Sequence, residues 1–133
     1  MKVLSKKVLL DTSAYSALHR GDLAVLEVLR STNEVGIPAV VLGELYSGFR
    51  QGTQWAENHT LLMDFLSQPS VRILPVTEET ALRYAEVDVY LRKHGRPIPR
   101  NDVWIAASAI EHGMQVLTLD EHFREIPLLV IRP

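Results

Sequence analysis

The stretch Lys7-Val-Leu-Leu-Asp11, followed by Thr12 and Ser13, decides the fold that we expect for this chain. A short aliphatic and β-branched run of this kind is typical of a buried strand, and the carboxylate after it marks a turn. Thr12 or Ser13 would then cap a helix over Tyr15 to His19. The chain therefore begins with a strand that leads directly into a helix.

The same alternation continues along the rest of the sequence. We expect further strands at 36–37, 71–76, 114–119 and 128–131. Helices are predicted between them, over 22–31, 38–52, 54–67, 77–95 and 101–113. Strands separated by helices indicate an α/β sandwich with a mostly parallel sheet, and such sheets bind ligands beyond the carboxyl ends of their strands.

Several residues mark the ends of these helices. Asp22 and Thr77 are predicted N-caps, and Gly113 is a predicted helix end. Asn101 or Asp102 would cap the last long helix. The helix after Thr77 carries Leu82, Ala85 and Val89 on one apolar face, with Leu91 as a further candidate.

The composition indicates one globular domain over 1–133. The 133 residues are 47% hydrophobic, and 14 Lys and Arg against 16 Asp and Glu give a net charge of −2, so no bulk positive field points to nucleic acid. The absence of cysteine excludes disulfides, thiolate metal sites and a cysteine nucleophile. No run resembles a signal peptide or a membrane helix, so we expect a cytoplasmic protein.

Carboxylates at the element boundaries are the first functional clue. Asp11 and Asp120 each follow a predicted strand, Asp102 stands at a helix start, and Glu44 lies beside the buried stripe of its helix. An unpaired carboxylate near the core costs several kcal/mol, so it needs a cation or an acidic neighbour that shares a proton. A hard divalent metal ion would meet this need, because Mg²⁺ takes oxygen ligands.

Each of these acids also has a structural explanation. Asp102 would be a helix cap, Asp11 and Asp120 would form turns with their own backbone, and Glu44 would bind Arg or Lys at an amphipathic edge. The four acids taken together favour a functional site, because the predicted architecture can bring all of them to one place. The sequence contains no P-loop, no Gly-x-Ser-x-Gly elbow and no His-Glu-x-x-His pair.

Four segments carry a family likeness, in the family's order and over essentially the whole chain: Val8-Leu-Leu-Asp-Thr-Ser13, Ile37-Pro-Ala-Val-Val-Leu-Gly-Glu-Leu-Tyr-Ser-Gly48, Ile98-Pro-Arg-Asn-Asp-Val-Trp-Ile-Ala-Ala107 and Leu117-Thr-Leu-Asp-Glu-His-Phe123. Together they resemble a PIN-domain ribonuclease of the VapC toxin type. The resemblance implies a three-layer sandwich around a five-stranded, mostly parallel sheet. It also implies a homodimer and a cognate antitoxin protein that blocks the active pocket in a larger complex.

The same resemblance implies that Asp11, Glu44, Asp102 and Asp120 bind Mg²⁺ or Mn²⁺ and hydrolyse RNA phosphodiesters. We expect Asp11 and Asp102 to be direct metal ligands. Glu44 would orient a water or bind metal when substrate arrives, and Asp120 would bind a second metal or position water. Three hydroxyl side chains look like the family's helpers, namely Thr12, Ser13 and Thr118.

A basic stretch precedes Asp102 and contains Arg92, Lys93, Arg96 and Arg100. It is either a solvated helix end or a basic lip, formed by Arg96 and Arg100, that holds RNA phosphates beside the acids. We expect the aromatic side chains Trp55, Phe65 and Trp104 to pack in the core or a dimer rather than stack on bases, and His122 to be structural rather than a ligand.

Two other functions remain open at this level. One is a non-catalytic PIN-like module that binds RNA or a partner, and the other is a metal-dependent nuclease that acts on DNA or in RNA processing. The complete set of four acids argues against the non-catalytic module, because a retired site should lose at least one of them.

Overall fold

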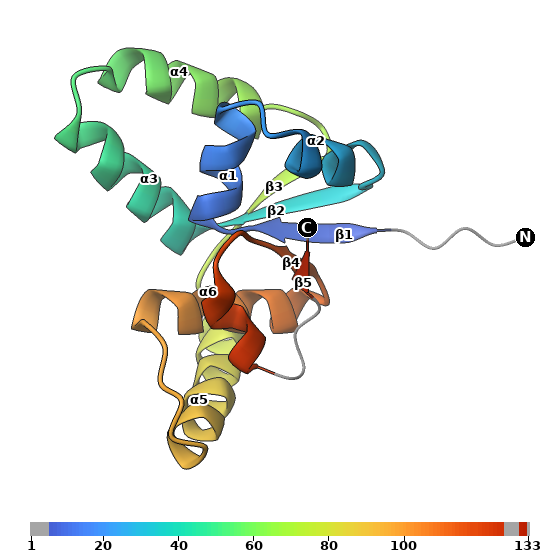
Figure 1. Ribbon diagram of the computed structural model, residues 1–133, viewed down its shortest axis with the longest axis vertical. Coiled ribbons are helices and arrows are strands. Elements are labelled where there is room, and N and C mark those ends of the chain that lie inside the picture. The colour runs from blue at the N-terminus through green and yellow to red at the C-terminus, as the bar shows by residue number, and fades with distance from the viewer. Residues whose placement is uncertain (1–5, 127–130, 133) are drawn as a thin grey trace, which may run out of the picture.

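One parallel sheet forms the centre of the protein (Figure 1). The computed structural model describes residues 6–126 and 131–132. Its strands are β1 (Lys7–Leu10), β2 (Glu34–Pro38), β3 (Val71–Leu74), β4 (Gln115–Leu117) and β5 (Ile131–Arg132). They lie in the order β3-β2-β1-β4-β5, and every neighbouring pair is parallel. The predicted mostly parallel sheet is thus confirmed, although its last strand contributes only two described residues.

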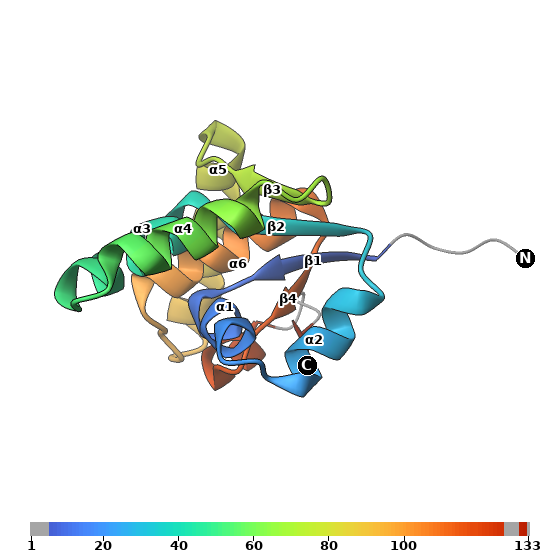
Figure 2. The same ribbon diagram turned by 90° about the horizontal axis from the view of Figure 1, so that it is seen from above.

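Helices cover both faces of this sheet, as Figures 1 and 2 show. One face carries α1 (Thr12–His19), α2 (Leu23–Arg30), α3 (Ala39–Gln51) and α4 (Trp55–Leu66). The other face carries α5 (Glu78–Lys93), α6 (Arg100–His112) and the short 3₁₀ helix η1 (Glu121–Glu125). This is the predicted three-layer α/β sandwich. No helix in the described parts of the chain is long and apolar enough to span a membrane.

The strand order places a topological switch point between β1 and β4. From β1 the chain steps outward to β2 and β3, then crosses to the other side of β1 to form β4. Connections of this kind are right-handed, so the reversal sends α1 to α4 to one face and α5 and α6 to the other. The chain segments that leave β1 and β4 therefore diverge, and a crevice opens at the carboxyl ends of these two strands.

Most helix ends follow the local sequence. Asp22 accepts from the Val25 backbone N–H, Thr77 and Thr80 form a capping box at the start of α5, and Gly113 ends α6 with a φ of 62°. That positive φ favours glycine because it lacks a Cβ atom.

Two predicted caps are wrong. The N-cap of α1 is Asp11, whose Oδ1 accepts from the Ala14 backbone N–H, and Thr12 already lies inside the helix. The residue before α6 is Pro99, which makes no side-chain cap bond, so Asn101 and Asp102 both lie in the first helical turn. Their side chains are therefore free for contacts outside the helix.

The core lies between the sheet and the two helical layers. Leu9, Leu10 and Ile37 from the strands are fully buried. The apolar face predicted for α5 is wrong for Leu82 and Val89, which are about half exposed. Leu91, the further candidate, is buried, and it shares the core side of the helix with Val87. Two strands are shorter than expected, at 71–74 and 115–117, and residues 128–130 of the last predicted strand lie outside the described residues.

Candidate active site

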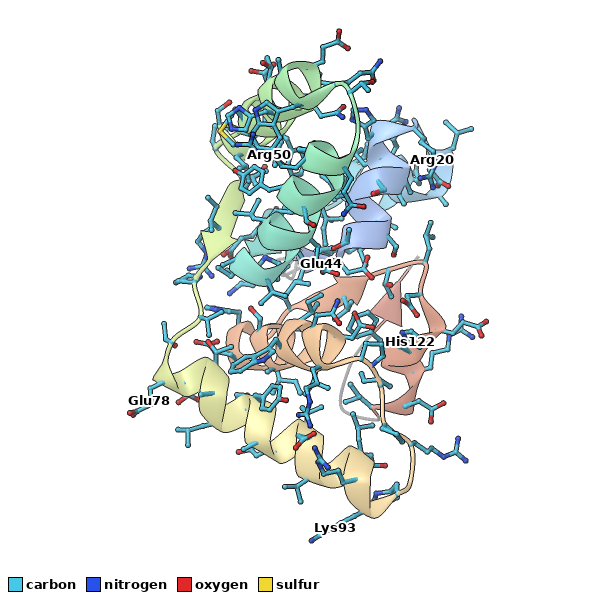
Figure 3. All side chains as sticks on the ribbon, turned by 90° about the vertical axis from the view of Figure 1, so that its left-hand side faces the viewer. Arg20, Glu44, Arg50, Glu78, Lys93 and His122 are labelled. Carbon is cyan, nitrogen blue, oxygen red and sulfur yellow. The ribbon has the colours of Figure 1, made fainter. Side chains whose placement is uncertain are left out.

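The four acids singled out from the sequence line one pocket at the switch point. Asp11 follows β1, Asp120 follows β4, Glu44 comes from α3 on one face of the sheet, and Asp102 comes from α6 on the other. The pocket has a volume of about 390 Å³ and is lined by Asp11, Thr12, Ser13, Glu44, Pro99, Asn101, Asp102, Ile105, Asp120 and His122. In Figure 3, Glu44 lies where the α3 layer meets the α6 layer, and His122 lies below it on the same side of the molecule.

Asp11 is held from two distant parts of the chain. Its Oδ1 accepts from Ser13 Oγ at 2.7 Å and from the Ala14 backbone N–H at 2.8 Å, and its Oδ2 accepts from Thr118 Oγ1. Thr118 lies beyond β4, so this bond ties the ends of the two central strands together. Asp11 is only 4% exposed, and with three hydrogen bonds its carboxylate has little freedom to turn.

Ser13 and Thr118 also organise the loop that carries Asp120. The Leu119 backbone N–H donates to Ser13 Oγ at 3.0 Å, and the Asp120 backbone N–H donates to Thr118 Oγ1 at 2.9 Å. Both hydroxyls therefore accept from this loop while they donate to Asp11. They position two of the four acids at once.

Glu44 is held by neutral donors. Thr12 Oγ1 donates to Glu44 Oε1 at 2.8 Å, and Asn101 Nδ2 donates to Glu44 Oε2 at 2.6 Å. No arginine or lysine in the described parts of the chain forms an ion pair with Glu44, so the amphipathic-edge explanation is wrong. Asn101, which the sequence indicated only as a helix cap, is thus part of the pocket.

His122 bridges the other two acids. Its Nδ1 lies 2.9 Å from Asp102 Oδ2 and 3.1 Å from Asp120 Oδ1. The three side chains could share one metal ion, since one ligand atom from each lies within 4.8 Å of the others. The sequence indicated a structural role for His122, and the structure adds that this side chain lines the acidic pocket, which makes it a candidate ligand. Its place two residues after Asp120 was the one sign in the sequence that it would reach the same pocket.

Crowding and burial oppose full ionisation of this cluster. Burial raises the pKa of Asp11 above its ordinary value, against the hydrogen bonds from Thr118, Ala14 and Ser13, and the charge of Asp120 raises it further. Burial likewise raises the pKa of Asp102, against the hydrogen bond with His122, and the charges of Asp120 and Glu44 raise it further. The hydrogen bond to Asp102 raises the pKa of His122, so the imidazole holds its proton more tightly. The pocket therefore favours bound positive charge.

Comparison with known proteins identifies the family. The sequence profile of the PIN domain matches residues 8–129. The chain belongs to the PIN domain family. Ribonuclease VapC5 of Mycobacterium tuberculosis is 30% identical to this PIN domain over 86% of the chain and 83% of that protein. Ribonuclease VapC2 of Rickettsia felis is 30% identical over 80% of the chain and 78% of that protein. The predicted resemblance to VapC-type PIN domains is confirmed.

The fold of this PIN domain also matches a solved structure. The crystal structure of VapBC2 from Rickettsia felis, bound to a DNA fragment from their promoter, superposes with a TM-score of 0.82. The match has 27% sequence identity and covers 95% of this chain and 97% of that chain.

The donor set of this PIN domain suits a divalent cation. Four carboxylates and one imidazole face the pocket, and the described lining contains no lysine or arginine that could neutralise them. A carboxylate offers about four acceptor positions. Asp11 uses three of them for protein donors, so one position on Oδ2 is left for a ligand. Hard cations such as Mg²⁺ and Mn²⁺ prefer these oxygen donors, and imidazole nitrogen adds preference for Mn²⁺.

The predicted basic lip is not assembled as one unit. Arg96 is 67% exposed and pairs with Glu125 at 3.1 Å, and Arg100 donates to the phenol oxygen of Tyr84 at 2.8 Å. Neither side chain lines the acidic pocket. Arg100 nevertheless lies next in sequence to Asn101, at the start of the helix that carries Asp102.

Proposed function

We propose that this PIN domain is a metal-dependent endoribonuclease that acts as the toxin of a toxin–antitoxin pair. The observation that carries the proposal is the pocket itself, in which carboxylates from four separate segments converge at the switch point of the sheet. The complete set of acids, each with its own supporting hydrogen bonds, argues against a non-catalytic module. The names of the two VapC relatives support ribonuclease as the activity.

Each acid has a proposed part in the reaction. Asp11 and Asp102 would hold the cation directly, Glu44 would orient the attacking water, and Asp120 would hold a second cation or position water. When bound, a divalent cation would make water a stronger nucleophile at neutral pH and offset the charge that develops on the scissile phosphate.

The neighbouring side chains preorganise these acids. Ser13, Thr118 and the Ala14 backbone N–H fix both oxygens of Asp11, so that its remaining lone pair points in a set direction. Thr12 and Asn101 do the same for Glu44. Hydrogen bonds that orient metal ligands in this way commonly change metal affinity by about 10- to 100-fold.

The proposed partners follow from the same relatives. The solved Rickettsia felis structure is of a VapBC2 complex on promoter DNA, which supports a cognate antitoxin protein as the regulator of this chain. We also propose a homodimer, which would form a larger complex with the antitoxin. An RNA-cleaving toxin would act in the cytoplasm, where its RNA is.

The test is cleavage of mixed cellular RNA by the purified protein, with Mg²⁺ or with a chelator. Asp11→Asn is the variant, and Asp64→Asn is the matched control because Asp64 is exposed on α4 away from the pocket. We expect the wild type and Asp64→Asn to cleave RNA only with Mg²⁺, and Asp11→Asn not to cleave. No cleavage by the wild type in any condition would leave the non-catalytic module, and preferential cleavage of single-stranded DNA would change the substrate.

A further inference from the structure

Two aromatic rings stack on each other between α5 and α6. The ring centroids of Tyr84 and Trp104 lie 4.2 Å apart, with an angle of 28° between the ring planes. Both side chains are partly exposed, so neither ring is sealed in the core. The guanidinium of Arg100 donates to the Tyr84 phenol oxygen at 2.8 Å and therefore lies at the edge of this pair.

This group lies beside the acidic pocket. Trp104 is three residues after Asn101 and four after Arg100 on the same helix, and residues at these spacings are neighbours on a helix surface. Asn101 lines the pocket and contacts Glu44. A chain that passes through the pocket can therefore reach the rings within about one helical turn.

Arg100 lies beside the ring pair, and its charge is available to a ligand. Arg92 pairs with Asp88 at 3.0 Å and Arg96 pairs with Glu125 at 3.1 Å. Asp88 also attracts Arg100. Within the described residues, however, no carboxylate comes within 4.0 Å of Arg100, and its hydrogen bond is to a neutral phenol.

We propose that Tyr84, Trp104 and Arg100 form a nucleotide-binding platform for single-stranded RNA next to the acidic pocket. One base stacks on the outer face of the ring pair, and Arg100 contacts a neighbouring phosphate. This inference rests on the proposed ribonuclease function and specifies how that site holds its substrate.

The chemistry of the pocket creates the need for such a platform. Four carboxylates repel a polyanion, and no described side chain in the pocket lining is a lysine or an arginine. Aromatic stacking does not depend on phosphate charge and tolerates any base, and a single guanidinium beside it holds the backbone. The overall charge of −2 is compatible with RNA binding when the contacts are local in this way.

The experiment measures binding of a labelled single-stranded RNA of about twelve nucleotides, without divalent metal, in the Asp11→Asn background. Trp104→Leu removes the ring, Trp104→Phe keeps an aromatic face, and Arg100→Gln removes the charge. Trp55→Leu is the matched control for the ring, because Trp55 packs against Tyr46, Phe49 and His59 in the α3–α4 region. Arg30→Gln on α2 is the control for charge, since Arg30 lies on the other face of the sheet from α5 and α6.

We expect Trp104→Leu to weaken binding by about five- to one-hundred-fold and Trp104→Phe to keep most of the affinity. Arg100→Gln should lower the slope of log affinity against log salt by about 0.7, the contribution of one single-strand phosphate contact. In the cleaving protein, the Trp104 change should raise KM and leave kcat nearly unchanged. Both controls should bind RNA as the parent does.

Three results would overturn the platform. If the wild type cleaves this RNA while Trp104→Leu binds it as tightly as the parent, the platform is wrong and the ribonuclease proposal stands. If Trp104→Leu turns a dimer into a monomer in sedimentation and RNA affinity does not change, the ring pair is an interface between copies of this chain. If the wild type neither binds nor cleaves the RNA, the ribonuclease proposal fails, and the platform fails with it.

Discussion

The side-chain amide of Asn101 donates to Glu44 Oε2 at 2.6 Å, and this contact joins helices from opposite faces of the sheet. Glu44 belongs to α3 and Asn101 belongs to α6, so the bond closes the pocket beyond the end of β1. It also fixes the side chain of Glu44 with a neutral donor, which leaves the negative charge in place.

Loss of this amide should destabilise the protein. Asn101→Ala leaves Glu44 without one of its two donors, and a hydrogen bond to a charged group contributes about 1.5–3 kcal/mol. Because Glu44 is partly exposed and water can replace the donor, we expect a loss of about 1–2 kcal/mol in the free energy of unfolding, measured in urea. Asn58→Ala, near the start of α4, makes the same replacement in another helix. Alanine has the higher helix propensity, so this change should be neutral or slightly stabilising. Equal effects of the two changes would contradict the structural role of Asn101.

Removal of the Asp11 charge should change how the stability of the metal-free protein depends on pH. Burial raises the pKa of Asp11, so the folded state binds this proton more tightly than the unfolded state does. The free energy of unfolding therefore falls as pH rises from the ordinary carboxyl pKa through the raised one. Asp11→Asn should lack this fall and be more stable than the wild type at neutral pH. The check is urea unfolding in a chelator from about pH 4 to pH 7, in which Asp64→Asn should follow the wild type.

Metal affinity should depend on the hydroxyl of Thr118. Thr118→Val keeps the side-chain shape but removes the donor to Asp11 Oδ2 and the acceptor for the Asp120 backbone N–H. We expect the affinity for Mg²⁺ to fall by about 10- to 100-fold, measured from the rise in Tm with metal concentration. Thr60→Val, at an exposed position on α4, is the control. An unchanged Tm response in Thr118→Val would argue against Asp11 as a metal ligand.

His122 should set a preference between metals. Imidazole nitrogen binds Mn²⁺ more readily than Mg²⁺, and His122 lies against both Asp102 and Asp120. The wild type should therefore gain more thermal stability from Mn²⁺ than from an equal concentration of Mg²⁺, and His122→Gln should reduce this difference. His94→Gln is the matched control, because His94 is exposed at the end of α5 and its Nδ1 contacts the Tyr90 carbonyl. If His122→Gln keeps the full difference, the imidazole is not a ligand.

Much of the fold could be predicted because its signals are local. Asp22, Thr77 and Gly113 mark helix ends through bonds and backbone angles within a few residues, and these depend little on the rest of the chain. The acids could be singled out for a related reason, because each stands where an element ends or beside a buried stripe. Their convergence follows from the strand order, which a parallel α/β arrangement restricts to few possibilities.

The errors arose where distant contacts decide between two acceptable local states. Asn101 is a good cap by local rules, but its amide faces Glu44, 57 residues away. On α5, Leu82 and Val89 form as good an apolar stripe as Val87 and Leu91 do. Thr80 lies on the same buried side of α5 as Val87 and Leu91. Its hydroxyl donates to Glu111 Oε1 on α6 at 2.6 Å, a contact that periodicity does not predict. Periodicity describes a stripe, but the partner that covers it is set by tertiary packing.

The cap bonds of Asp11 and Asp120 indicate which acids would be replaced first in the evolution of a protein that had lost its nuclease activity. Asp11 and Asp120 each accept a backbone N–H at the start of the helix that follows, so a descendant that no longer cleaved RNA would still keep a capping residue, such as Asp, Asn or Ser, at both positions. Among the described residues, no backbone N–H donates to the carboxylates of Glu44 and Asp102. These two acids would drift first once selection for cleavage ended. In related sequences, it is their presence that would distinguish a working nuclease from a retired one.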